Sequence, residues 1–593
     1  MKDINVLLKE YYGYSTFRKG QDDIINTIIA GNDSLVIMPT GGGKSICYQI
    51  SAMMLEGITI VISPLISLMK DQVDVLKTIG IPATFINSSL DISEYNHRMI
   101  GLEKGKYKIV YIAPERLENE TVVNRFCSLN ISQIAIDEAH CVSHWGHDFR
   151  PSYVTISQFI NNLENRPVVS AFTATATPKV REDIIDLLDL KQPKIFVQGF
   201  DRENLNFKVI RGAKREQYIL DYINKRPHES GIIYCSTRKQ VEQVYNYLKL
   251  KKCNAGKYHA GLSDMQRIKN QEAFLYDKIT IMVATNAFGM GIDKSNIRFV
   301  FHYNMPKNIE AYYQEAGRAG RDGEDSECIL FFQPQDIQIQ KYMIEHLDES
   351  TAERKKIKYE QLQKMVDYCY ITTCVRKYIL EYFGEVYIAN ECGNCSNCNQ
   401  DIEYEDITIE AQKIFSCIYR MKQRFGTTLV AKVLKGSKSK EVYKYAFDKL
   451  STYSIMRKYS IKNIQDIINM LVAEKYIRTT EDQYPVLKLE EKAFLVLKDK
   501  LKVEKPVLKQ VQQKQDDELF ESLRVLRKEI AEKENVPPFV IFHDSTLKEM
   551  AKKLPITEQD MLTIKGVGIH KYEKYGASFI ENIKQHKGTI RDQ

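Results

Sequence analysis

The residues with the clearest chemical potential form the segment Pro39-Thr40-Gly41-Gly42-Gly43-Lys44-Ser45. An apolar run precedes this segment and a helical stretch at 46–55 follows it. Successive glycines let backbone N–H groups surround phosphate oxygens, and a helix start adds the positive end of its dipole. Lys44 would then reach the terminal phosphates of a nucleotide, while the Ser45 hydroxyl would help to hold Mg²⁺. The alternative is a glycine-rich turn without a function.

A pair of carboxylates occupies the next position of interest, in Ile136-Asp137-Glu138-Ala139-His140. The pair follows an apolar run, and α/β sheets bind their ligands at the carboxyl ends of such strands. We expect Asp137 to bind Mg²⁺ and Glu138 to orient and deprotonate an attacking water. The alternative is a solvated loop end, where acidic residues are also common after a strand. The presence of the phosphate loop at 39–45 in the same chain favours the catalytic interpretation of Asp137 and Glu138.

Two arginines, Arg318 and Arg321, lie three residues apart in the segment 312–323. At that spacing they project from one side of a helix. Arginine is always charged and forks onto phosphate oxygens. If the two halves of the chain face each other, both side chains would act on the same nucleotide as arginine fingers in cis. A surface helix held by salt bridges is the alternative.

The elements that must position these residues alternate between short apolar runs and polar helical stretches up to about residue 345. β-Branched content and turn-rich flanks favour buried parallel strands at 34–38, 58–62, 109–112, 134–137, 168–171, 231–235, 281–284, 299–301 and 328–332. We therefore expect two α/β lobes joined near 199–206. Long charged helices follow to about residue 383, then a cysteine cluster, basic helical segments, a linker and a terminal helical segment.

Size and composition agree with several globular domains, since 593 residues exceed one hydrophobic core. The formal charge of +7 permits a polyanionic partner. No apolar run approaches the roughly 20 residues that cross a bilayer, and the N-terminus lacks the pattern of a signal peptide. We expect a protein of the cytosol without membrane association.

Three cysteines, Cys392, Cys395 and Cys398, have the CxxCxxC spacing that wraps a turn around one metal ion. Structural zinc takes four ligands, so the fourth must come from elsewhere. Cys369 and Cys374 both lie upstream, on different faces of a helix, so only one of them can serve. Zinc is the expected metal, and an iron–sulfur cluster is the alternative.

The order of these motifs resembles that of superfamily 2 helicases and, among them, the RecQ family. The loop matches the shorter PTGxGK form found in helicase motors, since Met38 breaks the longer phosphate-loop template. Further matching blocks lie at 17–21, 63–72, 111–117, 174–177, 236–238 and 284–294. The resemblance implies that Gln21 reads adenine, that Tyr14 stacks on it with Arg18 close by, and that Gln314 also contacts the nucleotide. It also selects Cys374 as the fourth zinc ligand.

The block 141–151, Cys-Val-Ser-His-Trp-Gly-His-Asp-Phe-Arg-Pro, is the most specific part of this resemblance. It resembles the aromatic-rich loop of RecQ motors, although His144 stands where the family more often has Gln. Aromatic rings stack on bases whatever the sequence. The resemblance implies that this region couples DNA binding to hydrolysis through the residues His140, Trp145, His147, Phe149 and Arg150.

The resemblance also implies the architecture: two RecA-like parallel-sheet lobes, a helical zinc-binding subdomain, a winged-helix domain and a small all-helical HRDC domain. The expected boundaries are 1–200 and 201–345 for the lobes, 346–403, 404–500, a linker at 501–515, and 516–593. It implies the cofactors ATP, Mg²⁺ and Zn²⁺, and 3′→5′ unwinding of DNA in recombination and repair. Expected partners are single-stranded, tailed or forked DNA, a single-stranded-DNA-binding protein and a topoisomerase, for a monomer at the bacterial nucleoid.

In the winged-helix segment, the candidate phosphate contacts are Arg420, Arg424, Lys435, Lys438 and Lys440. Tyr443, Tyr445 and Phe447 favour a core position over DNA contact. In the terminal domain, a glycine turn at 564–568 precedes the cations His570, Lys571 and Lys574, which suit backbone phosphate or form a solvated face.

Two other functions share part of this pattern. An RNA-remodelling ATPase would carry the same motor motifs without a reason for the aromatic loop, cysteine cluster and terminal domain together. A nucleic-acid scaffold with a decayed motor would have lost Lys44, Glu138 or an arginine, and all are present.

Overall fold

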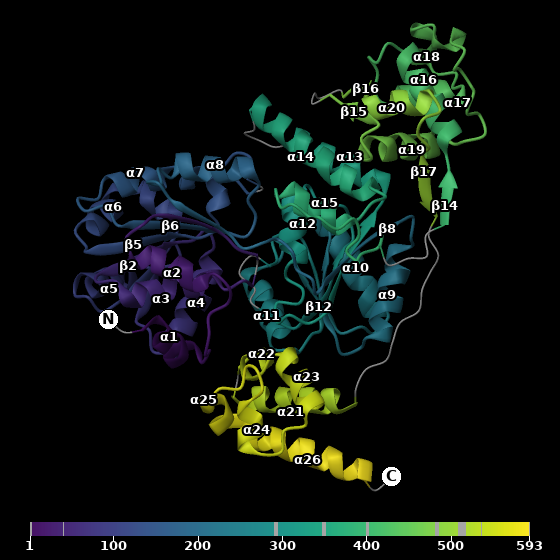
Figure 1. Ribbon diagram of the computed structural model, residues 1–593. Helices are drawn as coiled ribbons and strands as arrows, with labels where there is room; N and C mark the ends of the chain where they lie inside the picture. Colours follow the sequence, from purple (N-terminus) through teal and green to yellow (C-terminus); the bar gives the residue numbers. More distant parts are fainter. Residues whose placement is uncertain are drawn as a thin grey trace.

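The computed structural model describes residues 3–39, 41–146, 148–289, 294–346, 351–398, 403–480, 485–507, 518–534 and 536–591. Figure 1 shows two sheet-containing lobes side by side, a smaller domain beyond the second lobe, and a helical bundle beneath both lobes. Within the described residues, no helix has the length and apolar character needed to span a bilayer.

Lobe 1 is built on a seven-stranded sheet in the order β3-β4-β2-β5-β6-β1-β7, in which every pair of neighbours is parallel. Its strands are β1 (Ser34–Ile37), β2 (Ile58–Ile62), β3 (Ala83–Ile86), β4 (Ile109–Ile112), β5 (Ile131–Ile136), β6 (Val168–Thr173) and β7 (Lys194–Val197). Parallel neighbours require crossover connections, which the helices supply. These helices are α2 (Gln21–Ile29), α3 (Lys44–Met54), α4 (Ile66–Thr78), α5 (Ile92–Glu103), α6 (Glu120–Cys127), α7 (Thr155–Asn161) and α8 (Pro178–Leu187).

Lobe 2 repeats this plan with a six-stranded parallel sheet in the order β10-β11-β9-β12-β13-β8. Its strands are β8 (Leu205–Arg211), β9 (Ser230–Tyr234), β10 (Ala255–Tyr258), β11 (Ile281–Ala284), β12 (Ile297–His302) and β13 (Ser326–Phe332). Its helices are α9 (Arg215–Lys225), α10 (Arg238–Leu250), α11 (Asp264–Leu275) and α12 (Ile309–Ala316). The prediction of two parallel-sheet lobes is confirmed.

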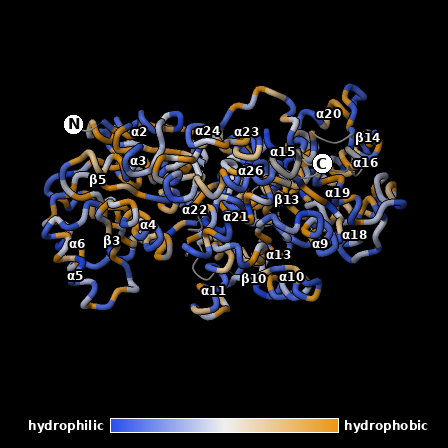
Figure 2. Tube along the Cα trace, turned by 90° about the horizontal axis from the view of Figure 1, so that it is seen from below, coloured by the Kyte–Doolittle hydropathy of each residue, from blue (hydrophilic) through white to orange (hydrophobic). Residues whose placement is uncertain are grey.

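Alternating strand residues fill the two faces of each sheet. In β1, Leu35 and Ile37 belong to one buried cluster and Val36 to another, as the two-residue period of a strand requires. Hydrophobic residues follow the inner strands of lobe 1 in Figure 2, for example along β5. Both faces are therefore covered, which explains why these strands read as continuous apolar runs.

Helices α13 (Pro334–Glu345), α14 (Ala352–Tyr370) and α15 (Val375–Tyr382) follow lobe 2 and share its core. The next domain contains α16 (Thr408–Arg420), α17 (Thr427–Lys435), α18 (Lys440–Lys444), α19 (Ile461–Ala473) and α20 (Glu491–Leu497). A hairpin of β15 (Ile477–Thr479) and β16 (Leu487–Leu489) supplies the predicted wing.

The predicted linker at 501–515 is wrong over part of its length. Strand β17 (Glu504–Val507) lies inside it and pairs antiparallel with β14 (Glu403–Asp406). The Ile407 N–H also donates to the carbonyl of Val503. Backbone hydrogen bonds to a distant strand leave no local periodicity, and Pro506 is compatible with a two-stranded edge. Residues 508–515 lie outside the described part of the chain.

The terminal bundle has its own buried core, which includes Leu523, Phe542 and Phe579. Its helices are α21 (Glu518–Glu534), α22 (Pro538–Ile541), α23 (Asp544–Lys553), α24 (Glu558–Leu562), α25 (Ile569–Lys571) and α26 (Ala577–Arg591). The bundle contacts lobe 2 through polar groups: His543 Nδ1 lies 2.7 Å from the Ser295 hydroxyl, and Asp544 lies 3.7 Å from Arg298.

Candidate nucleotide and nucleic-acid sites

The phosphate loop lies at the carboxyl edge of the lobe 1 sheet, between β1 and α3. Gly41 and Gly43 have φ values of 80° and 87°, which favour glycine, and Lys44 begins α3. The Lys44 ammonium lies 3.2 Å from the carbonyl of Met38. Burial lowers the pKa of Lys44, while the charges of Glu138 and Asp137 oppose that shift. Lys44 is therefore close enough to Asp137 and Glu138 for their charges to act on it, as the predicted nucleotide site requires. Thr40 lies outside the described residues.

Asp137 and Glu138 follow β5, two strands from β1 in the same sheet. Burial, and then the neighbouring charge of Glu138, raises the pKa of Asp137 to about 6. Glu138 has a φ of 48°, a left-handed backbone that is costly for a residue with a Cβ. His140 Nδ1 lies 3.3 Å from the Glu138 carboxylate and 3.0 Å from the Thr173 hydroxyl. The turn thus directs Glu138 toward His140 and the end of β6.

The predicted base-recognition residues contact the loop itself. The Gln21 amide donates to the carbonyls of Gly42 and Gly43 at 3.3 and 3.2 Å, and its oxygen accepts from the backbone N–H of Arg18. A Cβ at Gly43 would lie 2.4 Å from the Gln21 amide nitrogen, so this contact requires glycine. The guanidinium of Arg18 bonds to the carbonyl of Gly41. Tyr14 is 45% exposed, which leaves its ring accessible to a ligand.

The two arginines lie in the turn after α12, which ends at Ala316, so the prediction that they share one side of a helix is wrong. They occupy different environments. A Cβ placed on Gly41 would lie 3.2 Å from Cγ of Arg321, so that side chain packs on the phosphate loop across the interface between lobes. Its charge also lowers the pKa of Lys44. Arg318, by contrast, is buried inside lobe 2 and donates to the carbonyl of Gly289. The structure brings Arg321 to the loop, whereas the partners of Arg318 inside lobe 2 favour a structural role over the nucleotide contact predicted for it. Gln314 lies on buried helix α12.

The aromatic loop follows a short 3-10 helix, Ala139–Val142, directly after the acidic pair. Its turn requires Gly146, since a Cβ there would lie 2.1 Å from the carbonyl of His140. The rings of His144 and Phe149 stack with centroids 4.0 Å apart, and Arg150 donates to the carbonyl of Pro64 at 2.8 Å. Trp145 is half-buried. The loop therefore connects the acidic turn to a second predicted motif at 63–72; His147 lies outside the described residues.

The sequence did not single out two side chains of α14 that reach this loop. Gln361 donates to the carbonyl of Trp145 at 2.8 Å, and the guanidinium of Arg354 lies 4.7 Å from the Phe149 ring centroid. The charged composition of α14 is typical of a solvated helix, and only the seven-residue spacing of these two side chains places them on one face.

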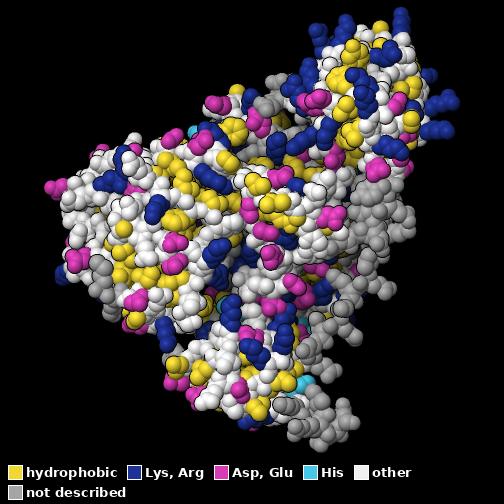
Figure 3. Space-filling model, in the orientation of Figure 1, with side chains coloured by type: hydrophobic (Ala, Val, Ile, Leu, Met, Phe, Trp, Pro, Cys, Tyr) yellow, Lys and Arg dark blue, Asp and Glu magenta, His cyan; other side chains and the backbone are white. Residues whose placement is uncertain are grey.

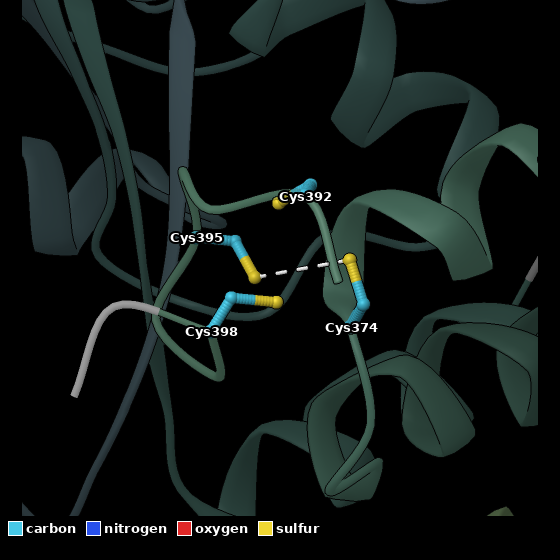
Figure 4. Close-up of side chains that lie close together, drawn as sticks. All are labelled: Cys374, Cys392, Cys395 and Cys398. Atoms are coloured by element: carbon cyan, nitrogen blue, oxygen red, sulfur yellow. Dashed lines mark hydrogen bonds between the residues drawn. The ribbon is translucent and has the colours of Figure 1, made fainter. Parts of the chain in front are cut away.

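Four cysteines converge on one point, as Figure 4 shows: Cys374, Cys392, Cys395 and Cys398 point toward one another. Their sulfur atoms all lie within 4.8 Å of one another. Tetrahedral zinc thiolates have Zn–S bonds of about 2.3 Å, which place sulfurs about 3.8 Å apart, so small adjustments give the zinc geometry. Cys374 caps the start of α15, and backbone N–H groups lie 3.4 Å from Cys374 and Cys392 Sγ. Cys369 lies in α14 and outside this cluster, so the prediction that it shares one helix with Cys374 is wrong.

Basic side chains gather on the domain beyond lobe 2, at the upper right of Figure 3. Of the predicted phosphate contacts, Arg420, Arg424, Lys438 and Lys440 are exposed. Lys435 instead donates to the carbonyl of Arg457. The expectation of a core position holds for Phe447, which begins a 3-10 helix after α18, and is wrong for Tyr443 and Tyr445, which are 50% and 46% exposed.

In the terminal bundle, the predicted phosphate-binding residues Lys571 and Lys574 instead contact other groups of the bundle. Lys571 donates to the carbonyl of Val540 at 2.8 Å, and Lys574 pairs with Glu534. Burial lowers the pKa of Lys571 to about 8. A phosphate site at these two lysines is therefore not favoured, and the side chain of His570 lies outside the described residues.

Comparisons with known proteins cover nearly the whole chain. Family models match as follows: "DEAD/DEAH box helicase" at 18–184, "Helicase conserved C-terminal domain" at 214–323, "RecQ zinc-binding" at 334–399, "RQC domain" at 401–514 and "HRDC domain" at 516–583. The ATP-dependent DNA helicase RecQ of Bacillus subtilis is 49% identical over 98% of both chains. That of Pasteurella multocida is 40% identical over 98% of this chain and 94% of its own. A putative ATP-dependent RNA helicase of Acanthamoeba polyphaga mimivirus is 39% identical over 81% of this chain and 88% of its own.

The relatives and the family models agree with the geometry. Two parallel-sheet lobes meet at a phosphate loop, an aromatic loop follows the acidic turn, and four thiols converge beyond lobe 2. The chain belongs to the RecQ family of helicases.

Proposed function

We propose that this chain is a DNA helicase that hydrolyses ATP with Mg²⁺ between its two lobes and uses the cycle to translocate 3′→5′ and unwind duplexes. The contact of Arg321 from lobe 2 with the phosphate loop of lobe 1 carries this proposal. A catalytic arginine from the opposite lobe makes hydrolysis depend on how the lobes are arranged, and lobe movement is what a motor requires.

In this proposal each side chain has one task. Residues 40–45 bind the phosphates, with Lys44 at the β and γ positions. Ser45 and Asp137 would hold Mg²⁺, which when bound would supply positive charge beside the phosphates. Glu138 orients the attacking water and takes its proton, and His140 holds that carboxylate at 3.3 Å. Tyr14, Arg18 and Gln21 bind the nucleotide base, and Gln314 contacts the nucleotide from lobe 2.

Nucleic acid is expected on two surfaces. The aromatic loop supplies Trp145 and Phe149 for stacking, while the exposed cations Arg420, Arg424, Lys438 and Lys440 contact backbone phosphates without reading sequence. DNA is the proposed substrate because the RecQ relatives at 49% and 40% identity are named DNA helicases. RNA is the second candidate, since the mimivirus relative is named as a putative RNA helicase.

The remaining expectations follow from the family and stay proposals: a role in recombination and repair, partners such as a single-stranded-DNA-binding protein and a topoisomerase, a monomeric state and work at the nucleoid. Domain boundaries at 200, 345 and 403 are proposed as well, with the winged-helix domain extended through β17.

The zinc ion would hold α15 against the loop at 392–398, with four thiolates and no open position for chemistry.

Two measurements test the proposal. The first compares ATP hydrolysis with single-stranded DNA and single-stranded RNA, and we expect stimulation mainly by DNA. The second follows strand separation of duplexes with 3′ or 5′ tails, with Lys44→Ala as the control, and we expect unwinding of the 3′-tailed substrate only. Unwinding that survives Lys44→Ala, or stimulation by RNA alone, would overturn the proposal.

A further inference from the structure

One side chain of α14 connects the two lobes. Gln361 is only 8% exposed and uses both ends of its amide. Its nitrogen donates to the carbonyl of Trp145 in lobe 1 at 2.8 Å, and its oxygen accepts from the side-chain amide of Asn308 in lobe 2 at 3.3 Å. In Figure 1, α14 extends from lobe 2 toward lobe 1, which is the position that this bridge requires.

Asn308 links this bridge to the catalytic arginine. It is the N-cap of α12, and its side-chain oxygen accepts from the backbone N–H of Ala311 at 3.0 Å. Every residue of α12 is buried, and the turn that follows it carries Arg321. Close-packed interiors transmit displacements rather than absorb them, so a shift at this cap moves the far end of the helix.

The same helix also covers the aromatic loop. Arg354 lies 4.7 Å from the centroid of the Phe149 ring, and the His144 ring stacks on it with a centroid distance of 4.0 Å. The His144 and Phe149 ring planes are 22° apart, so the imidazole already stacks on the phenyl ring, and the Arg354 guanidinium lies over the same ring. A nucleic-acid base that stacks on Phe149 competes with these two groups for the ring.

From these contacts we propose that Gln361 is a positioning residue that transmits occupancy of the aromatic loop to Arg321. A base that displaces Arg354 shifts the loop, the carbonyl of Trp145 moves with it, and Gln361 passes the movement to Asn308 and α12. This inference rests on the proposed function, since it concerns how DNA stimulates the same hydrolysis.

The test compares Gln361→Ala with Gln363→Ala. Gln363 lies on the same helix and bonds within it, to Asp367 at 2.8 Å, so it controls for general damage to α14. We expect Gln361→Ala to lower the ratio of DNA-stimulated to basal ATPase roughly fivefold, the effect of one lost buried hydrogen bond on a coupling equilibrium. The loss should appear in kcat at saturating DNA and leave KM for ATP unchanged, whereas Gln363→Ala should retain the wild-type ratio.

Trp145 provides an independent signal because it is the only tryptophan in the chain. Its fluorescence should change when single-stranded DNA binds, and Gln361→Ala should shift the emission of the free protein and reduce the DNA-induced change. Gln361→Glu keeps the size of the side chain and the acceptor for Asn308 but cannot donate to the Trp145 carbonyl. We expect it to reproduce the loss even if the alanine variant folds poorly.

Two failures can be told apart. A wild-type protein whose ATPase does not respond to single-stranded DNA contradicts the proposed function. A responsive wild type together with a folded Gln361→Glu variant that keeps both the stimulation ratio and the Trp145 emission contradicts only the role of Gln361.

Discussion

Arg321→Ala and Arg318→Ala form a matched pair, since the two arginines are three residues apart in one motif and differ in what they contact. Arg321 packs on Gly41 of the phosphate loop, while Arg318 is 4% exposed inside lobe 2. We expect the first change to remove catalysis and the second to remove mainly stability.

The magnitudes follow from these contacts. An arginine supplied in cis to the transferred phosphoryl group contributes about 10³-fold or more to turnover. At ~1.4 kcal/mol per tenfold, Arg321→Ala should raise the barrier by about 4 kcal/mol. Nucleotide affinity should change much less, because Gln21, Arg18 and Lys44 line the loop independently of Arg321.

Arg318→Ala removes the donor to the carbonyl of Gly289 and a hydrogen bond with the Tyr234 hydroxyl. A buried polar group left without its partner costs about 1–3 kcal/mol. We therefore expect a lower melting temperature and a reduction in kcat of less than about tenfold, a change of ~1.4 kcal/mol in the barrier.

The assay is phosphate release over a range of ATP concentrations at saturating single-stranded DNA, with binding of a fluorescent ATP analogue and thermal unfolding measured on the same samples. Arg321→Lys keeps the charge without the fork and should recover part of the rate. If Arg318→Ala abolishes turnover while Arg321→Ala stays within about tenfold of wild type, the assignment from geometry is wrong.

Three further changes test other parts of the structure. Trp145→Ala should retain nucleotide binding but lose the stimulation of hydrolysis by DNA, and a fully stimulated variant would contradict its coupling role. Cys374→Ser should lose bound zinc, whereas Cys369→Ser should keep one zinc ion per chain. Elemental analysis that finds iron, or an equal zinc content in the two variants, would argue against the proposed zinc site. The Arg527 guanidinium lies 2.8 Å from the Asp544 carboxylate, and both side chains are buried. Asp544→Ala leaves this guanidinium without its carboxylate partner and should destabilise the terminal bundle by about 3–5 kcal/mol in thermal unfolding. Burial alone would raise the pKa of Asp544, but nearby arginines hold that pKa below its ordinary value of 3.8. The stabilising contribution of Asp544 is therefore present above pH 3.8 and is lost as the pH falls through the lower pKa of the folded state. In acid, the melting temperature should fall more for the wild type than for Asp544→Ala, and an equal fall would show that this pair contributes nothing.

Apolar runs predicted β1, β2, β4, β5 and β6 in lobe 1 and β9, β11, β12 and β13 in lobe 2, all of which are largely buried. They missed β3, although three of its four residues are buried, and β8, in which buried and partly exposed residues alternate. The edge strand β7 was missed because its residues are largely exposed, and β10 because glycine and lysine interrupt its apolar run. Strand β17 was taken for linker because its partner lies about 100 residues away.

The sequence by itself determined the chemistry of this protein. The phosphate loop, acidic pair, arginines and cysteines are short segments in which spacing and local conformation specify function. The resemblance to the RecQ family, rather than cysteine spacing, selected Cys374 over Cys369, and the convergence of the four thiols agrees with that choice.

Only the tertiary structure decided which of these groups meet. It placed Arg321 rather than Arg318 on the phosphate loop. It paired Lys571 and Lys574 with groups of the terminal bundle. It also brought Gln361 between the aromatic loop and α12. Such contacts join residues that are tens to hundreds of positions apart. They depend on how close-packed elements approach one another, and neither periodicity nor motif spacing records that approach.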